Sequence, residues 1–348
     1  MVEASAGAAG DRGVAVAGHS NLRPPYPADS ALREGLEGIF RRARPHARLE
    51  IVSRQLNPFT STFASEKVVC RVDGEVVRLF CKYGTGRNAA EQGADPKLLG
   101  YETEIYRSVL PTLQVSTPLF HGAILSGLPH SPWLFIEDLD GATQLDKSPT
   151  LDVYLRAAAW IARFHDESRA LLDDPRARFI RRFVLDDYLA PIEPIGSMDL
   201  FGAEGDWLGE VIERYCDLAP ILTDDPVLTH GEYYPQNILV RGDRIAPVDW
   251  QGARIGAAEV DLAMLTDAWS NRQTARMVQH YRSASRQKMS DESFERRFLA
   301  ARIYVQLYWL TTEPGRVRFL RSEARHLGVK VPKAPPRPTR QGPGRPAS

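Results

Sequence analysis

Two side chains that can offer oxygen ligands, Asn237 and Asp249, lie on either side of a short polar turn at 242–244. The apolar runs that flank this turn predict a β-hairpin. A three-residue loop would place Asn237 opposite Asp249, and a four-residue loop would place it opposite Val248, so the sequence leaves the register open. Either register puts an amide oxygen and a carboxylate at one end of a rigid ribbon. Mg²⁺ bound to a phosphate chain suits such a site, because it keeps waters and takes only one or two carboxylates from the protein. A hairpin with incidental polar ends is the alternative.

The same segment carries several further motifs in a fixed order. They are His230-Gly231-Glu232, then Asn237, then Val248-Asp249-Trp250, then Gly256 and Asp261-Leu262-Ala263. Together these resemble the aminoglycoside phosphotransferase family of small-molecule kinases, whose pattern is H-G-D-x-x-x-x-N, then D-W or D-F, then G-x-x-x-x-D-L-A. The resemblance extends over most of residues 50–320 and is strongest at 226–265. It implies an α+β, bilobal protein-kinase-like fold, with a small lobe of antiparallel sheet plus helix and a larger, mainly helical lobe.

The resemblance also implies a role for each motif residue. Asn237 and Asp249 are similar to the family's ligands for the Mg²⁺ that bridges to the ATP phosphates. Glu232 stands where the family normally has Asp, the catalytic residue that accepts a hydrogen bond from the substrate hydroxyl. Asp261 is expected to brace the backbone of the loop at 230–237. Three further residues are expected to be buried structural residues: His165, His230 and Trp250.

In the small lobe, Lys82 follows the apolar strand run at 76–81, which begins after an Asp-Gly turn typical of a hairpin. Kinases place their phosphate-binding lysine at such a strand end. That lysine usually pairs with an acidic residue on the next helix, expected here at 98–110. The family spacing favours Glu102 as the partner and leaves Glu104 to face solvent.

The remaining nucleotide contacts are implied by position in the family pattern. The loop that would cover the phosphates, at 57–65, contains no glycine, and Ser61 is its candidate contact. The segment after the apolar run at 133–136 resembles the hinge between lobes. Backbone groups at Glu137 and Leu139 are expected to pair with the edge of adenine.

The glutamate at position 232 leaves two hypotheses about function. Intrinsic acidity hardly separates Glu from Asp, whose ordinary pKa values differ by roughly 0.4. The length of the side chain does separate them, because Glu is one methylene longer and a misplacement of about 1 Å can cost on the order of a hundredfold in rate. A retracted loop would give an ATP- and Mg²⁺-dependent kinase of a small polar molecule, such as a sugar, an amino alcohol or an aminoglycoside-like compound. Otherwise the chain is a nucleotide-binding pseudokinase or a regulatory binding module.

Composition shifts along the chain predict its organisation. Residues 1–30 and the basic, proline-rich residues 329–348 are expected to be disordered tails. Residues 31–137 would form the nucleotide-binding small lobe, and 138–328 the helical catalytic and substrate lobe. In the helical lobe, Tyr308 and Trp309 are candidates either for the wall of the substrate pocket or for the core, and their helical spacing favours the core.

The overall charge and the lengths of the apolar runs argue against some classes of partner. The 348 residues carry 44 Lys plus Arg and 44 Asp plus Glu, so the chain lacks the basic excess typical of nucleic-acid binding. No apolar run approaches the roughly 18 residues that a membrane helix needs, and no membrane partner is expected. Three cysteines without a C-x-x-C pair suggest a reduced chain, for which the cytoplasm is the expected location.

Overall fold

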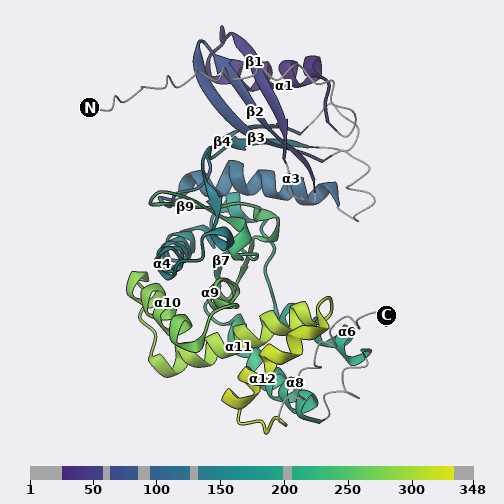
Figure 1. Cartoon of the computed structure of the whole chain (residues 1–348), viewed down its shortest axis with the longest axis vertical. Coiled ribbons are helices and arrows are strands. Elements are labelled where there is room, and N and C mark those ends of the chain that lie inside the picture. Colours follow the sequence, from purple (N-terminus) through teal and green to yellow (C-terminus); the bar gives the residue numbers. More distant parts are fainter. Residues whose placement is uncertain (1–25, 58–62, 85–94, 126–131, 199–205, 333–348) are drawn as a thin grey trace, which may run out of the picture. The chain divides into compact units, whose positions relative to one another are not determined.

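The computed structural model describes residues 26–57, 63–84, 95–125, 132–198 and 206–332. The chain divides into two compact units (Figure 1). Unit 1 comprises 1–112, 116–142 and 241–251, and unit 2 comprises 113–115, 143–240 and 252–348. Most of the two predicted tails, and the predicted loop contact Ser61, lie outside the described residues.

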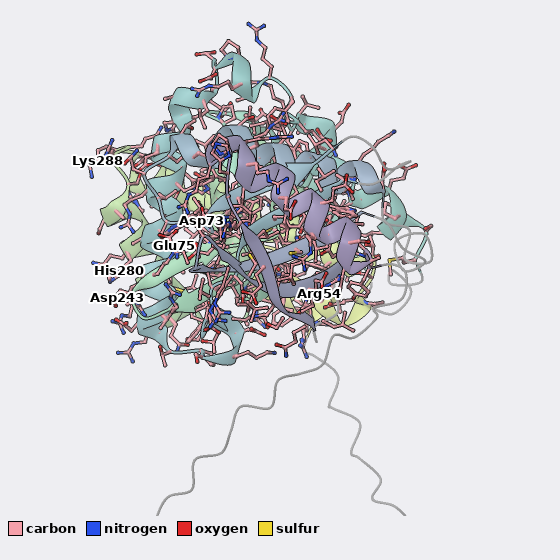
Figure 2. The ribbon with its side chains drawn as sticks, turned by 90° about the horizontal axis from the view of Figure 1, so that it is seen from above. Arg54, Asp73, Glu75, Asp243, His280 and Lys288 are labelled. Carbon is pink, nitrogen blue, oxygen red and sulfur yellow. The ribbon has the colours of Figure 1, made fainter. Side chains whose placement is uncertain are left out.

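Unit 1 is built on one antiparallel sheet whose strand order is β1-β2-β3-β5-β4. Its strands are β1 (Leu49–Leu56), β2 (Ala64–Val72), β3 (Glu75–Tyr83), β4 (Phe120–Ile124) and β5 (Trp133–Glu137). The predicted Asp-Gly hairpin is confirmed: Asp73 (φ 53°) and Gly74 (φ 87°) connect β2 to β3. Positive φ at both central residues is the type I′ pattern, which matches the twist of paired strands. Figure 2 labels Asp73 and Glu75 at this turn.

One helix covers the sheet and completes the core of unit 1. Helix α1 (Asp29–Ala43) buries Leu32, Leu36 and Ile39 among apolar strand residues. Arg54 on β1 joins the helix to the sheet, because its guanidinium donates to Asp29 Oδ1 at 2.6 Å and to both carboxylate oxygens of the buried Glu66. The sheet therefore provides a fixed platform for the side chains at the end of β3.

The helical stretch predicted after β3 is present, and its hydrogen bonding changes along its length. Helix α3 (Pro96–Glu104) begins with Asp95 as N-cap, whose carboxylate accepts a hydrogen bond from the N–H of Lys97. The α-helical hydrogen bonding ends at Glu104, and residues Ile105–Val109 form a π-helical turn before a short 3₁₀ turn at Leu110–Thr112. The wider turn is closed by the N–H of Leu110, which donates to Ile105 O. The helical stretch expected at 98–110 is therefore present, and the change from α to π hydrogen bonding within it is an irregularity that local propensity does not reveal.

Unit 2 is mainly helical, as predicted. Its longer helices are α4 (Leu151–Ser168), α8 (Asp206–Leu218), α9 (Ala258–Thr266), α10 (Asn271–Ala284), α11 (Asp291–Leu310) and α12 (Val317–His326), and its shorter ones are α5 (Leu185–Leu189) and α6 (Ile192–Gly196). Helix α4 packs against α10, and α11 packs against both α9 and α12 (Figure 1). Every residue of α9 is buried, so this helix forms the centre of the unit.

Short strands lie directly before and after the motif segments. Strand β7 (Val227–Thr229) pairs antiparallel with β10 (Arg254–Gly256), and β6 (Thr143–Gln144) pairs with β8 (Ile238–Arg241). Strand β9 (Arg244–Pro247) follows β8 after only Gly242 and Asp243. Both expected loop lengths were therefore wrong. Gly242, at φ 57°, adopts the left-handed conformation that so tight a connection requires.

No helix within the described segments has the length and apolar character needed to span a bilayer.

Candidate active site

Lys82 lies near the end of β3, where it is 6% exposed. Its ammonium donates to both carboxylate oxygens of Glu102 on α3, at 2.8 and 2.9 Å, and to Asp249 Oδ1 at 2.9 Å. All three residues belong to unit 1. The ion pair expected between Lys82 and Glu102 is present, and Glu104 instead bonds Arg107 and Ser108 near the surface. A buried lysine is thus held by two carboxylates that come from distant parts of the chain.

The charges around Lys82 decide its protonation. Burial by itself lowers the pKa of Lys82, but the carboxylates of Asp249 and Glu102 outweigh burial, and the pKa is raised above its ordinary value. Burial raises the pKa of Glu102, and the Lys82 ammonium opposes that rise. Lys82 is therefore a fixed cation at neutral pH. A compact ammonium of this kind can neutralise charge on a phosphate chain.

Asp249 has a left-handed backbone conformation, which is uncommon outside glycine, although Asp tolerates it better than most residues. Its φ of 68° is left-handed, one of three non-glycine cases in the described residues. The next residue, Trp250, is fully buried, and its N–H donates to Glu102 Oε1 at 3.3 Å. Trp250 is therefore a core residue, as predicted. Glu102 thus holds both Lys82 and the chain after Asp249, and this surrounding structure imposes the strained conformation. The Asp249 carboxylate remains 33% exposed and can reach a ligand.

The predicted hinge follows β5 in unit 1. The Glu137 carboxylate accepts two hydrogen bonds from Arg244, at 2.7 and 2.8 Å. The backbone N–H of Glu137 donates to Leu119 O. Burial raises the pKa of Glu137, but the Arg244 hydrogen bond and charge lower it below its ordinary value. Among the described residues, the N–H of Leu139 has no acceptor, whereas its carbonyl accepts from Ala142. The Leu139 N–H is therefore a donor without an acceptor among the described residues, at the position where the hinge is predicted.

In unit 2, Asp261 on α9 fixes the backbone of the loop after β7. Its carboxylate accepts from the N–H of His230 at 2.7 Å and from the N–H of Gly231 at 2.9 Å. His165 Nε2 lies 3.1 Å from the same carboxylate, and His165 Nδ1 lies 2.9 Å from the hydroxyl of Tyr281. Asp261, His165 and His230 are all buried. The expected bracing role of Asp261 is confirmed, as is the structural position of the two histidines.

The network around Asp261 predicts a specific loss of stability. Burial raises the pKa of Asp261, but His165 and the loop N–H groups lower it below 3.8, its ordinary value. The ionised Asp261 carboxylate therefore contributes fully to the stability of the folded protein above its ordinary pKa. This contribution is lost as the pH falls through the lower pKa of Asp261 in the folded state. Asp261→Asn leaves a buried N–H without a good acceptor, and we expect it to cost about 1–3 kcal/mol at pH 7.

Urea unfolding at pH 7 and at pH 3 checks this expectation. The stability difference from the wild-type protein should shrink at the lower pH. The same change at the exposed Asp217 is the matched control and should have little effect. An Asp261→Asn protein as stable as the wild type at pH 7 would contradict the assignment.

Glu232 follows Gly231, and position 231 requires glycine. Gly231 adopts φ 81°, and a Cβ on it would lie 1.9 Å from the carbonyl oxygen of Gly252. Gly252 in turn faces the Glu232 side chain, since a Cβ at 252 would lie 2.7 Å from Glu232 Cγ. The absence of a side chain at 252 provides the space that the extra methylene of Glu232 occupies. Sequence reasoning missed Gly252, although a glycine two residues after Asp-Trp was the available signal.

This contact predicts that Gly252→Ala impairs turnover only when a glutamate occupies position 232. The new methyl group would push Glu232 aside, and a displacement of about 1 Å costs on the order of a hundredfold in rate. In a Glu232→Asp background the shorter side chain leaves room, so alanine at 252 should change kcat little. A double-mutant cycle on kcat measures this coupling. Equal effects of Gly252→Ala in both backgrounds would show that the contact has no role in positioning.

Asn237 ends the 3₁₀ turn Pro235–Asn237, directly before β8. Its Nδ2 donates to Glu232 O at 3.0 Å, which leaves the amide Oδ1 as the ligand atom. Within the described part of the chain no group of three or more His, Cys, Asp or Glu residues could hold a metal ion. Mg²⁺ needs no such group, because it binds through one or two protein oxygens together with waters and phosphates. An amide oxygen, as at Asn237, and a carboxylate oxygen, as at Asp249, are each of the kind that this ion binds.

A pocket of about 130 Å³ adjoins Glu232 in unit 2. Glu232, Asn237 and Arg254 line it together with aromatic residues of α11, among them Tyr308 and Trp309. Tyr308 is 46% exposed, so the favoured core position was wrong for Tyr308, whereas Trp309 is partly buried. Both residues line this pocket, which was the alternative expectation. Helical spacing identifies a face of α11 but cannot say whether that face meets protein or an open pocket.

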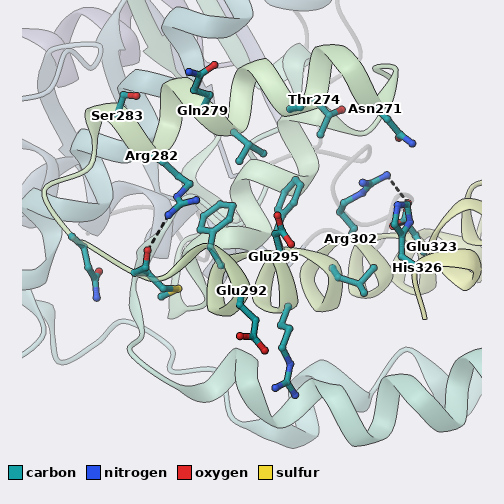
Figure 3. Close-up of a pocket in the computed structure, with 18 of the residues that line it drawn as sticks. Asn271, Thr274, Gln279, Arg282, Ser283, Glu292, Glu295, Arg302, Glu323 and His326 are labelled. Carbon is teal, nitrogen blue, oxygen red and sulfur yellow. Dashed lines mark hydrogen bonds and ion pairs between the residues drawn. The ribbon is translucent and has the colours of Figure 1, made fainter. Parts of the chain in front are cut away.

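A larger pocket lies elsewhere in unit 2. It encloses about 970 Å³ between α10, α11 and α12, and Arg282, Glu295 and Arg302 are among its lining residues (Figure 3). None of the predicted site residues lines it. Volume alone therefore does not locate the chemistry of this protein.

Comparison with known proteins agrees with the motif order. Residues 89–300, more than half of the chain, match the sequence model of the phosphotransferase enzyme family (APH). No curated protein sequence matches the chain significantly.

Similar solved structures share the fold. The GDP complex of wild-type aminoglycoside 2′-phosphotransferase-IIIa is 16% identical, with a TM-score of 0.55 over 85% of this chain and 96% of that one. The GDP and kanamycin complex of the same type of enzyme is 16% identical, with a TM-score of 0.56 over 84% and 96%. Spectinomycin phosphotransferase, in complex with ADP and spectinomycin, is 11% identical, with a TM-score of 0.51 over 85% and 93%. The α+β fold is therefore the protein-kinase-like fold of these enzymes.

The family match over more than half of its length, with the motif residues in the family's order, shows that the chain belongs to the phosphotransferase enzyme family and is a small-molecule kinase with an alcohol group as acceptor.

Proposed function

We propose that this enzyme transfers the γ-phosphate of ATP, with Mg²⁺, to a hydroxyl group of a small polar molecule. The observation that carries the proposal is the buried Lys82 ammonium, held between Glu102 and Asp249. Burying a charge is costly unless it is paired, and a pair that includes a left-handed aspartate adds backbone strain. Such an arrangement is typical of a site that binds a ligand.

Each residue of the proposal has one task. Lys82 would bind the α- and β-phosphates, with Glu102 holding it in place. Asn237 and Asp249 would be the protein ligands of Mg²⁺, which supplies neutralisation of charge on the phosphate chain. Glu232 would accept the hydrogen bond of the acceptor hydroxyl and orient its oxygen toward the γ-phosphorus. The Leu139 N–H and the Glu137 carbonyl would pair with adenine, and Ser61 remains a predicted contact of the phosphate-covering loop.

Positioning dominates this chemistry. Phosphoryl transfer passes through a loose transition state, in which orientation and charge stabilisation contribute more than proton abstraction. A new P–O bond forms to the acceptor oxygen as the bond to the β-phosphate oxygen breaks, and the hydroxyl proton passes to Glu232. The fixed loop at 230–237 and the space at Gly252 are what keep the longer carboxylate in reach.

A nucleotide-binding pseudokinase is the second candidate function, and the glutamate at 232 is the observation that favours it. The space beside Gly252 supports the active enzyme instead, since a relic has no need to accommodate the longer side chain.

Cellular location and partners complete the proposal. The free thiols of Cys70, Cys81 and Cys216 support our proposal of a cytoplasmic location. We propose neither a nucleic acid nor a membrane as partner.

A phosphotransfer screen tests the proposal. The full chain is incubated with ATP or GTP and Mg²⁺ against sugars, amino alcohols and aminoglycosides, and phosphorylated product is measured by mass. Calorimetry measures nucleotide binding with and without Mg²⁺. Product formation that depends on Mg²⁺ and prefers ATP supports the proposal. Mg²⁺-dependent nucleotide binding without any product supports the pseudokinase, and absence of nucleotide binding contradicts both.

A further inference from the structure

The peptide that joins Gly231 to Glu232 determines the direction of the Glu232 side chain. Glycine restrains its own backbone torsions very little, and Gly231 adopts φ 81°. The N–H of Gly231 donates to Asp261 Oδ1 at 2.9 Å, which fixes the peptide before this glycine. The peptide after it can still rotate about the glycine. Contacts from other parts of the chain therefore have to fix the orientation of Glu232.

Arg254 and His230 make contacts with the two polar groups of that peptide. Arg254 Nη2 donates to Gly231 O at 3.2 Å, and the N–H of Glu232 donates to His230 Nδ1 at 3.3 Å. Both distances lie at the long end of the usual range, so neither bond alone fixes the peptide firmly. A charged donor makes the stronger hydrogen bond. The guanidinium of Arg254 is therefore the main restraint on the Gly231 carbonyl.

Arg254 is itself held in place. It begins β10 opposite Thr229 of β7, and Thr229 Oγ1 donates to Arg254 O at 2.9 Å. The Cζ of Arg254 lies 4.2 Å from the ring centroid of Phe183, a distance typical of a cation–π contact. The N–H of Phe183 in turn donates to Ile255 O at 2.9 Å. A strand and an aromatic ring of unit 2 therefore direct the guanidinium at the loop.

The guanidinium also packs against the loop beside the proposed catalytic carboxylate. A Cβ on Gly231 would lie 3.2 Å from Arg254 Nη1, so the second terminal nitrogen lies close to this glycine as well. Arg254 and Glu232 line the same pocket of about 130 Å³. Arg254 lies outside the motif residues that predicted the site. The structure therefore adds a charged contact of the Glu232 loop that motif spacing did not indicate.

We infer that Arg254 is a positioning residue for phosphoryl transfer: by holding the Gly231 carbonyl, it keeps the Glu232 carboxylate directed at the acceptor hydroxyl. The inference rests on the proposed function of Glu232. Without the guanidinium, the Gly231 carbonyl loses its charged donor, and the glycine allows the peptide to rotate. A rotation that moves the carboxylate by about 1 Å costs on the order of a hundredfold in rate.

Hydrogen exchange of the full chain tests the positioning without any acceptor. Arg254→Met keeps an unbranched apolar side chain and removes the donors. We expect the backbone amides of 231–233 to exchange at least about fivefold faster than in the wild type, because a peptide without its fixed partner opens more often. Arg181→Met is the matched control. The Cζ of Arg181 lies 4.8 Å from the same Phe183 ring, but Arg181 does not line the pocket, and its replacement should leave this exchange unchanged.

Turnover separates positioning from binding. The substrates are ATP, Mg²⁺ and whichever of glucose, ethanolamine and kanamycin the wild-type enzyme phosphorylates fastest. Arg254→Met should lower kcat on the order of a hundredfold and leave KM for ATP and for the acceptor within about threefold. Arg254→Lys retains a charged donor and should recover part of kcat. In a Glu232→Ala background, Arg254→Met should change kcat by less than about threefold, because the side chain that it positions is gone.

Three outcomes would overturn the inference. One is unchanged hydrogen exchange in Arg254→Met. Another is a higher acceptor KM with an unchanged kcat, which would assign Arg254 to acceptor binding. The third is an equal loss of kcat in the wild-type and Glu232→Ala backgrounds, which would make its role one of folding.

Failure of the proposed function gives a different result. In that case the wild-type protein binds no nucleotide, whatever residue occupies position 254. If the wild type binds nucleotide but phosphorylates none of the three acceptors, hydrogen exchange alone decides whether Arg254 fixes the loop.

Discussion

Asp249→Asn is expected to reduce kcat/KM for ATP on the order of a thousandfold, because one change removes both a charged metal ligand and a partner of Lys82. Asparagine is the informative replacement. It is among the few residues that tolerate the left-handed backbone seen at 249, so the fold should survive. Steady-state kinetics over a range of Mg²⁺ concentrations measures the effect, and the variant should require more Mg²⁺ than the wild type.

Asp243→Asn is the matched control for this prediction. Asp243 is an exposed carboxylate in the connection between β8 and β9, in the same stretch of chain. Its replacement should leave kcat/KM within about twofold, as is usual for surface changes. Wild-type kinetics in Asp249→Asn would show that Lys82 and Asp249 form a structural ion pair only.

Glu232→Gln is expected to lower kcat by about 10²–10⁴-fold, the usual contribution of a positioned acid–base group. The amide keeps the length of the side chain and its packing against Gly252 but can no longer take the hydroxyl proton. Glu232→Asp retains the carboxylate with shorter reach, and we expect it to keep more activity than the amide. Single-turnover kinetics with saturating acceptor isolates the transfer step.

Glu213→Gln, at an exposed position on α8, controls for the chemical change itself. It should not alter kcat. Full activity of Glu232→Gln would exclude Glu232 as the residue that receives the proton. An Asp variant faster than the wild type would show that the longer carboxylate is badly placed here.

The sequence by itself determined the local elements and the order of the motif residues. Asp73-Gly74 adopts the positive φ values that its residue types favour, and Lys82 and Glu102 meet because a strand end and the next helix bring them together. Asp261 bonds the loop at 230–231 as the family pattern implies. These features depend on short stretches of chain or on motif spacing, and both are visible in the sequence.

Only the tertiary structure decided the conformation of Asp249, the space at Gly252 and the exposure of Tyr308 and Trp309. Each depends on atoms far away in the sequence: Glu102 holds the chain after Asp249, Glu232 fills the space beside Gly252, and α11 meets a pocket where its apolar pattern suggested packing. Strain and pocket shape arise when separate segments compete for the same space. Residue types and spacing do not contain that information, because the neighbour that limits a residue is chosen by the folded chain.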